Sequence, residues 1–385
     1  MKRVYLDFAA AAPATPRAVR AFLYALSRVG NPGAPHTEGR EARILLEKAR
    51  ETIARIVGTK TDGVVFTSGA TESNNLAICG VVEDKKRKGV SYTDMHLLYQ
   101  EGAHASIVET MKEMEQRGVV VATIPLQDGA LSLKALEQKL QKNTVLVSVE
   151  SIASETGMRT HTRDVRRVLD TNAPHALLHV DASQTPLVES VERTHLGADL
   201  LVLDAQKIGG VRGIGVLVRA PKVSLSPVLF GGGQEGGLRS GTPTVALAHA
   251  FATALTDAES IREKFIAQAT RARTLLKNLL INETANIVAN EGKENAPHIL
   301  NISFIGRDTD YLLALMDASG YALSTKSSCE TDETGSRGVS ALTNDALRAS
   351  YTIRISWGSE VSLGTLKRFA NKLNRAVAFI DSHSL

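Results

Sequence analysis

Residues 176–207 read ALLHVDASQTPLVESVERTHLGADLLVLDAQK. Two short apolar runs, Ala176 to Val180 and Leu200 to Leu203, are each followed directly by an aspartate. Apolar runs of this length, bounded by such breaks, are typical of buried strands in a parallel sheet. Ligands of α/β proteins bind beyond the carboxyl ends of these strands, so the residues that follow each run are the first candidates for a functional site.

The same pattern continues on both sides of this stretch. Helical patterns separate the apolar runs, as in residues 41–57, where Leu45, Ala49 and Ile53 recur at helical spacing. The alternation predicts an α/β fold with one large, mostly parallel seven-stranded sheet. The strand candidates are Gly63 to Thr67, His96 to Tyr99, Val119 to Ile124, Thr144 to Val149, Ala176 to Val180, Leu200 to Leu203 and Gly215 to Val218.

The C-terminal third predicts a smaller α/β lobe. Val245 to about Leu280 reads as one long helix that could bridge two domains. Strand candidates follow at His298 to Phe304 and around Tyr351 to Ser356, with a helix near 309–318 and a closing helix that has one apolar face. A polar stretch from Ser324 to Ser340 lies between them.

Composition excludes several classes of function. The 45 Lys and Arg against 41 Asp and Glu leave a net charge of only +4, aromatic residues are 4% of the chain, and the one basic run, Lys85 to Lys88, falls at a predicted helix end, where cations suit the dipole. We therefore expect no nucleic-acid partner. The chain has no apolar run of about 18 residues, so no membrane span is expected.

Cysteine usage indicates a reducing compartment. Cys79 and Cys329 are the only cysteines, too few for a disulfide framework or a Cys-rich metal site. The N-terminus reaches Asp7 before any apolar run of signal-peptide length. We expect a cytoplasmic protein with no metal centre.

Three groups that follow strand candidates could bind a cofactor. Ala70 and Thr71 open a predicted helix, whose free amides favour an anion such as phosphate. The alternative is a plain helix cap with Thr71 or Ser68 as the N-cap. Asp181 could hold a protonated ring nitrogen, or could be another cap. Lys207, if desolvated, could form a Schiff base, whereas a lysine at a strand end is usually solvated.

Other side chains suit substrate binding or catalysis. Arg354, inside an alternating strand, could grip a carboxylate, or could lie on an exposed face. His104 could stack on a planar cofactor or move protons, or could be structural. Cys329 lies in the polar stretch and indicates an accessible thiol, whereas Cys79 is interpreted as helix packing.

Taken together and in this order, these segments resemble the cysteine desulfurases of the NifS/IscS type, which are fold-type I pyridoxal-phosphate enzymes of the class V aminotransferase family. The resemblance covers nearly the whole chain. It rests on Tyr5-Leu6-Asp7, Gly30-Asn31-Pro32, Phe66 to Asn75, His104, Val180-Asp181, Lys207-Ile208, Gly213-Ile214-Gly215, Gly231 to Thr242, Cys329 and Ile353-Arg354.

The resemblance implies how the chain divides. It implies a large domain that binds pyridoxal phosphate over residues 16–255. A small domain would be formed by residues 1–15 and 256–385, and would carry a mobile cysteine loop at about 324–340. A homodimer is implied as well.

Residue roles also follow from the resemblance. Lys207 would form the Schiff base with the cofactor and act as catalytic base, and Cys329 would accept the sulfur. The other implied contacts are Asp181 with the pyridinium nitrogen, His104 stacked on the ring, Ala70 and Thr71 with the phosphate, Thr242 with the phosphate across the dimer interface, Gln184 with the phenolic oxygen, and Arg354 with Asn31 for the substrate carboxylate.

The chain departs from the family pattern at three cofactor-binding positions. Asp204 and Gln206 replace a serine and a histidine that bind the phosphate, and Ser154 replaces an asparagine that contacts the phenolic oxygen. A carboxylate beside a phosphate dianion is repulsive unless it is protonated, turned away or paired with a cation.

The resemblance implies an L-cysteine desulfurase that converts L-cysteine to L-alanine and holds sulfur as a persulfide on Cys329. The sulfur would pass to an acceptor or scaffold protein for iron-sulfur clusters or thiolated cofactors. The alternatives are another class V reaction, such as a selenocysteine lyase or an aminotransferase, and a degenerate non-catalytic paralogue.

Overall fold

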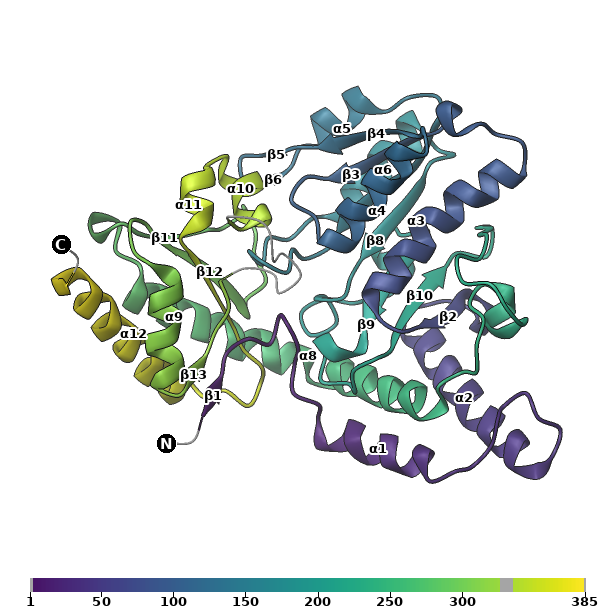
Figure 1. The fold of residues 1–385 in the computed structure, drawn as a ribbon, viewed down its shortest axis with the longest axis horizontal. Coiled ribbons are helices and arrows are strands. Elements are labelled where there is room, and N and C mark those ends of the chain that lie inside the picture. Colours follow the sequence, from purple (N-terminus) through teal and green to yellow (C-terminus); the bar gives the residue numbers. More distant parts are fainter. Residues whose placement is uncertain (1–2, 326–334, 384–385) are drawn as a thin grey trace.

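A seven-stranded sheet forms the centre of the larger part of the molecule (Figure 1). The computed structural model describes residues 3–325 and 335–383. The strand order is β2-β10-β9-β8-β7-β3-β4, and every neighbouring pair is parallel except the two that β10 makes. The strands are β2 (Val64–Thr67), β3 (His96–Gln100), β4 (Val120–Ile124), β7 (Thr144–Glu150), β8 (Leu177–Asp181), β9 (Leu200–Asp204) and β10 (Gly215–Arg219).

Helices cover both faces of this sheet because successive strand residues point to opposite sides. In β2, Val65 packs in the core cluster that contains α3 and α4, whereas Phe66 packs in the cluster on the other face. Both faces of the sheet are therefore buried in hydrophobic cores. The helices of this part are α1 (Pro16–Leu26), α2 (Thr37–Ile56), α3 (Ala70–Arg87), α4 (Ala105–Gln116), α5 (Leu133–Lys139), α6 (Thr162–Asn172) and α7 (Arg193–Leu196), and β5 (Leu126–Gln127) pairs with β6 (Ala130–Leu131).

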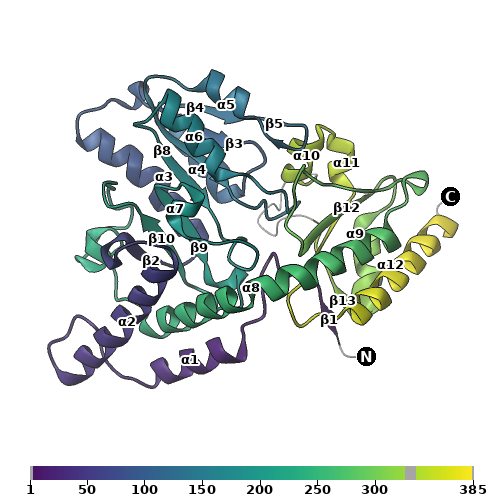
Figure 2. The same ribbon diagram turned by 180° about the vertical axis from the view of Figure 1, so that it is seen from behind.

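The long helix α8 (Val245–Leu280) joins the two parts of the molecule (Figure 2). Residues such as Phe251 and Leu255 pack in the core of the large sheet. Leu276 and Leu280, farther along the same helix, pack in the core of the small part. One continuous helix therefore contributes to two separate hydrophobic cores.

The smaller part is built on an antiparallel sheet. Its strand order is β11-β12-β14, and β1 pairs with β13 in a separate parallel pair. Leu6 and Phe8 pack in its core, so the N-terminal segment belongs to this part although it is far away in sequence. Its elements are β1 (Val4–Tyr5), β11 (Ile287–Ala289), β12 (Ile299–Phe304), α9 (Thr309–Ala318), β13 (Tyr321–Ala322), α10 (Arg337–Thr343), α11 (Ala346–Ser350), β14 (Thr352–Ser356) and α12 (Leu363–His383).

The α/β fold with a seven-stranded, mostly parallel sheet and a smaller C-terminal lobe agrees with the sequence prediction. The strand ends differ from the prediction by at most one residue, and two other boundaries differ by more. Helix α2 begins at Thr37 rather than near 41, because the His36 ring accepts a hydrogen bond from the Gly39 amide and caps the first turn. The end of the predicted 324–340 loop is helical from Arg337, because the Ser336 hydroxyl caps α10 through the Val339 amide.

No helix among the described residues combines the length and apolar character that a bilayer span requires.

We predict that Leu276→Ala lowers the free energy of unfolding by about 2–5 kcal/mol, because Leu276 is fully buried and the substitution leaves a cavity in the small core. Leu347→Ala is the control, since Leu347 is 63% exposed, and should change stability by less than about 0.5 kcal/mol. Urea unfolding of both variants measures the difference. Equal effects would contradict the assignment of Leu276 to a packed core.

Candidate active site

A cavity of about 300 Å³ lies at the carboxyl ends of β7, β8 and β9. It brings together nine of the residues predicted to bind a cofactor or catalyse: Ala70, Thr71, His104, Ser154, Asp181, Gln184, Asp204, Gln206 and Lys207. Its lining also contains Glu150, Ser183, Ile152, Ala10 and Ala11, which the sequence analysis did not select. Glu150 is the last residue of β7, so the strand-end rule applied to every strand would have found it.

Lys207 lies on a short turn, Ala205–Lys207, directly after β9. Its Nζ donates hydrogen bonds to the carbonyl oxygens of Ala9 at 3.0 Å and Ala10 at 2.8 Å. Gln184 Nε2 donates to the same Ala9 carbonyl at 2.8 Å. The N-terminal segment therefore closes one side of the cavity and holds the lysine amine inside it.

Asp181 is the last residue of β8 and is almost fully buried. Its Oδ1 accepts hydrogen bonds from the amide and hydroxyl of Ser183, at 2.9 and 2.6 Å. Its Oδ2 accepts from Asn74 Nδ2 at 2.8 Å. These three hydrogen bonds hold the carboxylate in one orientation, as a partner for a cationic ring nitrogen requires.

A chain of hydrogen bonds links Asp181 to His104. The second proton of Asn74 Nδ2 goes to Ser106 Oγ at 2.8 Å, which leaves the Ser106 hydroxyl proton for His104 Nδ1, also at 2.8 Å. The Ser106 amide donates to the same Nδ1 at 3.1 Å. Because Nδ1 accepts, the proton of the neutral imidazole is on Nε2.

His104 therefore has two roles. It caps α4 through the Ser106 amide, which was the structural alternative, and its ring also lines the cavity. Burial lowers the pKa of His104 below its ordinary value, and the opposing charge of Asp181 does not compensate. The ring is neutral at pH 7.

The predicted anion site lies at the N-terminus of α3. The N-cap is Gly69, and neither Ser68 nor Thr71 caps the helix through its side chain, so the plain-cap alternative is wrong. The Ala70 amide instead donates to Asp204 Oδ2 at 3.1 Å. A side-chain carboxylate of this chain thus already lies on the first amide of the helix.

Arg354 is buried, at 2% exposure, so the exposed-face alternative is wrong. Its Nη2 donates to Asp7 Oδ1 at 2.8 Å, and its Nη1 donates to the Ser154 carbonyl at 3.1 Å. The guanidinium therefore contacts the backbone of Ser154, a residue that lines the cavity.

Two other predicted site residues, Asn31 and Thr242, do not line this cavity. Asn31 is exposed, and its side-chain oxygen accepts a hydrogen bond from the Gly33 amide, while Thr242 is exposed in the glycine-rich loop. Cys329 lies outside the described residues. Cys79 is buried in helix α3 and burial raises the pKa of its thiol to about 11, which agrees with its interpretation as a packing residue.

Two ion pairs, one mostly buried and one partly exposed, hold the glycine-rich loop, residues 231–242, against the sheet domain. Glu235 makes a two-point contact with Arg50 at 2.8 Å for each pair, and also accepts from the Phe66 amide at 2.9 Å on the edge strand β2. Arg239 Nε donates to Glu72 in the first turn of α3 at 2.9 Å. Burial opposes ionisation of Glu72, but the hydrogen bonds from Arg239 and Ser68 outweigh it and lower its pKa.

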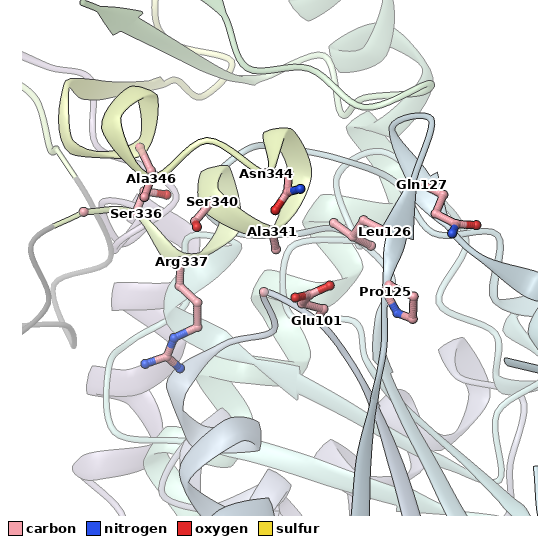
Figure 3. Close-up of a pocket in the computed structure, with 13 residues that line it drawn as sticks. Glu101, Pro125, Leu126, Gln127, Ser336, Arg337, Ser340, Ala341, Asn344 and Ala346 are labelled. Atoms are coloured by element: carbon pink, nitrogen blue, oxygen red, sulfur yellow. The ribbon is translucent and has the colours of Figure 1, made fainter. Parts of the chain in front are cut away.

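A larger cavity, of about 830 Å³, lies between the sheet domain and α10 (Figure 3). Glu101 and Leu126 approach it from the large part, and Ser336, Arg337 and Asn344 from the small part. None of the predicted site residues that the structure describes lines it. The candidate active site is therefore the smaller cavity, where the predicted residues meet.

Comparison with known proteins identifies the family. The family model described as aminotransferase class-V matches residues 4–367. The chain belongs to this family. It is 32% identical to the mitosomal cysteine desulfurase of Encephalitozoon cuniculi over 382 residues, which are 98% of this chain and 87% of that protein.

Solved structures agree with this assignment. A NifS-like protein has a TM-score of 0.90 and 28% identity, and the match covers 98% of this chain and 100% of that one. A structure described as SspA in complex with cysteine has a TM-score of 0.77 and 26% identity, and the match covers 91% of this chain and 98% of that one. The predicted fold class and the resemblance to cysteine desulfurases are confirmed.

We predict that the His104 ring is neutral at pH 7 and carries its proton on Nε2. Because the pKa of His104 is lowered in the folded protein, the folded state binds fewer protons at this ring than the unfolded chain does below about pH 6.5. The neutral ring therefore contributes fully to stability above that pH, and this contribution is lost as the pH falls. Nitrogen NMR of ¹⁵N-histidine-labelled protein gives the tautomer, and His104→Gln identifies the signal. A doubly protonated ring, or a proton on Nδ1, would contradict the hydrogen-bond directions.

Proposed function

We propose that this class-V aminotransferase family member is an L-cysteine desulfurase that depends on pyridoxal phosphate. The observation that carries the proposal is the placement of Lys207, Asp181 and His104 around one cavity at the carboxyl ends of the sheet. The relatives described above as cysteine desulfurase and as a cysteine complex support the substrate.

The residues around the cavity fit the ring of this cofactor. A half-buried lysine amine suits an aldehyde, and a buried carboxylate fixed by Asn74 and Ser183 suits a protonated ring nitrogen. His104 supplies an aromatic surface, and Gln184 and Ser154 supply polar groups. At the phosphate end, the Ala70 amide is available only if Asp204 releases it.

Bound pyridoxal phosphate supplies an electron sink for bond cleavage at the substrate α-carbon. Lys207 would hold the cofactor and, once released by the substrate amine, would take the α-proton. Asp181 would keep positive charge on the ring nitrogen, and the Nε2 proton of His104 is available for donation into the cavity. Arg354, fixed by Asp7, would bind the substrate carboxylate near Ser154.

Sulfur transfer is assigned to Cys329 by the family resemblance. Its thiolate would attack the substrate sulfur and keep it as a persulfide, while the remaining carbon skeleton leaves as alanine. The homodimer, with Thr242 and Asn31 contributing to sites, the cytoplasmic location and the sulfur-accepting partner for iron-sulfur cluster assembly stay predictions from the sequence.

We predict that the protein incubated with pyridoxal phosphate and desalted keeps a visible absorption band. Lys207→Ala should lose it, because Lys207 is the one lysine among the described residues that lines the cavity. Lys222→Ala is the matched control, since Lys222 is exposed on the protein surface, and should keep the band. Absence of the band in the unmodified protein would contradict the proposed function and favour a chain that has lost cofactor binding.

We predict that Cys329→Ser releases alanine from L-cysteine on the order of 10²-fold more slowly, because serine cannot attack the substrate sulfur to form a persulfide. Cofactor absorption should be unchanged. Cys79→Ala, which removes the other thiol, should release alanine at nearly the normal rate. Normal alanine release by Cys329→Ser would show that the persulfide mechanism is wrong.

A further inference from the structure

Asp204 lies where the family resemblance places a phosphate ligand, yet its side chain is an acceptor. Its Oδ2 accepts from the Ala70 amide at 3.1 Å and from Gln206 Nε2 at 3.2 Å, and its Oδ1 accepts from the Gln206 amide at 3.0 Å. Three N–H groups are thus directed at one carboxylate. A phosphate oxygen would need the same kind of donors.

Within the described part of the chain, the negative charge of Asp204 has no cationic partner. The side chain is 4% exposed, and within residues 3–325 and 335–383 no lysine, arginine or histidine lies within ion-pair distance of it. Arg239 of the glycine-rich loop is paired with Glu72 in the first turn of α3. The N-terminal end of the α3 dipole and the three N–H groups are what stabilise the carboxylate.

We propose that Asp204 is an internal anion that occupies the phosphate end of the cofactor site, so that this chain gains little affinity from the phosphate group of its cofactor. The inference rests on the proposed function. A phosphate dianion can take the Ala70 amide only when the Asp204 carboxylate moves off it, and two anions this close repel each other in a site with little water.

The residue at position 204 should affect the phosphate end of the cofactor and not the ring end. The ring end, with Lys207, Asp181 and His104, keeps its contacts whatever residue is at position 204. When an uncharged side chain replaces the Asp204 carboxylate, the Ala70 and Gln206 amides are no longer bound to an anion. They can then donate to the phosphate. Affinity for an aldehyde with a phosphate should therefore change, and affinity for one without a phosphate should not.

The test compares pyridoxal phosphate with pyridoxal, which lacks the phosphate. Dissociation constants are measured in phosphate-free buffer from the Lys207-dependent absorption and by equilibrium dialysis. In the unmodified protein the two aldehydes should bind with similar constants. Asp204→Asn and Asp204→Ser should each bind pyridoxal phosphate about tenfold more tightly or better, with the pyridoxal constant unchanged.

The matched control is Asp62→Asn, which removes the same charge from an exposed residue. Asp62 precedes the first residue of β2, whereas the cofactor site lies beyond the last. This variant should bind both aldehydes as the unmodified protein does. Two variants are used at position 204 so that a folding defect in one, seen in its thermal melting, does not decide the result. Pyridoxal phosphate bound equally by all four proteins, or more weakly by both Asp204 variants, would overturn the inference while leaving the proposed function standing.

Inorganic phosphate is a second probe that does not need Lys207. By equilibrium dialysis, Asp204→Ser should bind it about tenfold more tightly than the unmodified protein. If no protein shows Lys207-dependent absorption but Asp204→Ser still binds phosphate more tightly, the proposed function fails and the role of Asp204 stands. If phosphate binding does not differ, the inference fails whatever the aldehydes do.

Discussion

Parallel pairing of β7, β8 and β9 is the constraint on which the site depends. The register pairs Glu150 with Asp181, and Asp181 with Val202. Because parallel strands end at the same edge of a sheet, Glu150, Asp181 and Asp204 leave the sheet close together and one cavity collects their side chains. The strand directions decide this placement before any side-chain contact is made.

The N-terminal segment then couples the cavity to the small part of the molecule. Leu6 and Phe8 are buried in the small core, which fixes the course of residues 7–10. The carbonyls of Ala9 and Ala10 consequently face Lys207, and Asp7 holds Arg354. Hydrophobic burial at the start of the chain thus positions both the Lys207 amine and the Arg354 guanidinium.

Residues of the small part form hydrogen bonds to the loop that carries Ser154. Glu155 accepts hydrogen bonds from the Ser336 hydroxyl and from the Gly338 amide at 3.0 Å, and Asn301 Nδ2 donates to the Glu155 carbonyl at 3.1 Å. These contacts join the two parts beside the cavity. Residues 335–340 are therefore anchored where the described chain resumes after residue 334.

The sequence alone determined the fold class, the strand positions and most of the cavity lining, because short apolar runs and the residues directly after them are local signals. It could not determine which partner each polar group has. The link from Asp181 through Asn74 to His104, the burial of Arg354 and the pairing of Arg50 with Glu235 join residues that are far apart in the chain. Such contacts exist only after packing brings their elements together, so the tertiary structure decided them, including the contact that places the Asp204 carboxylate on the Ala70 amide.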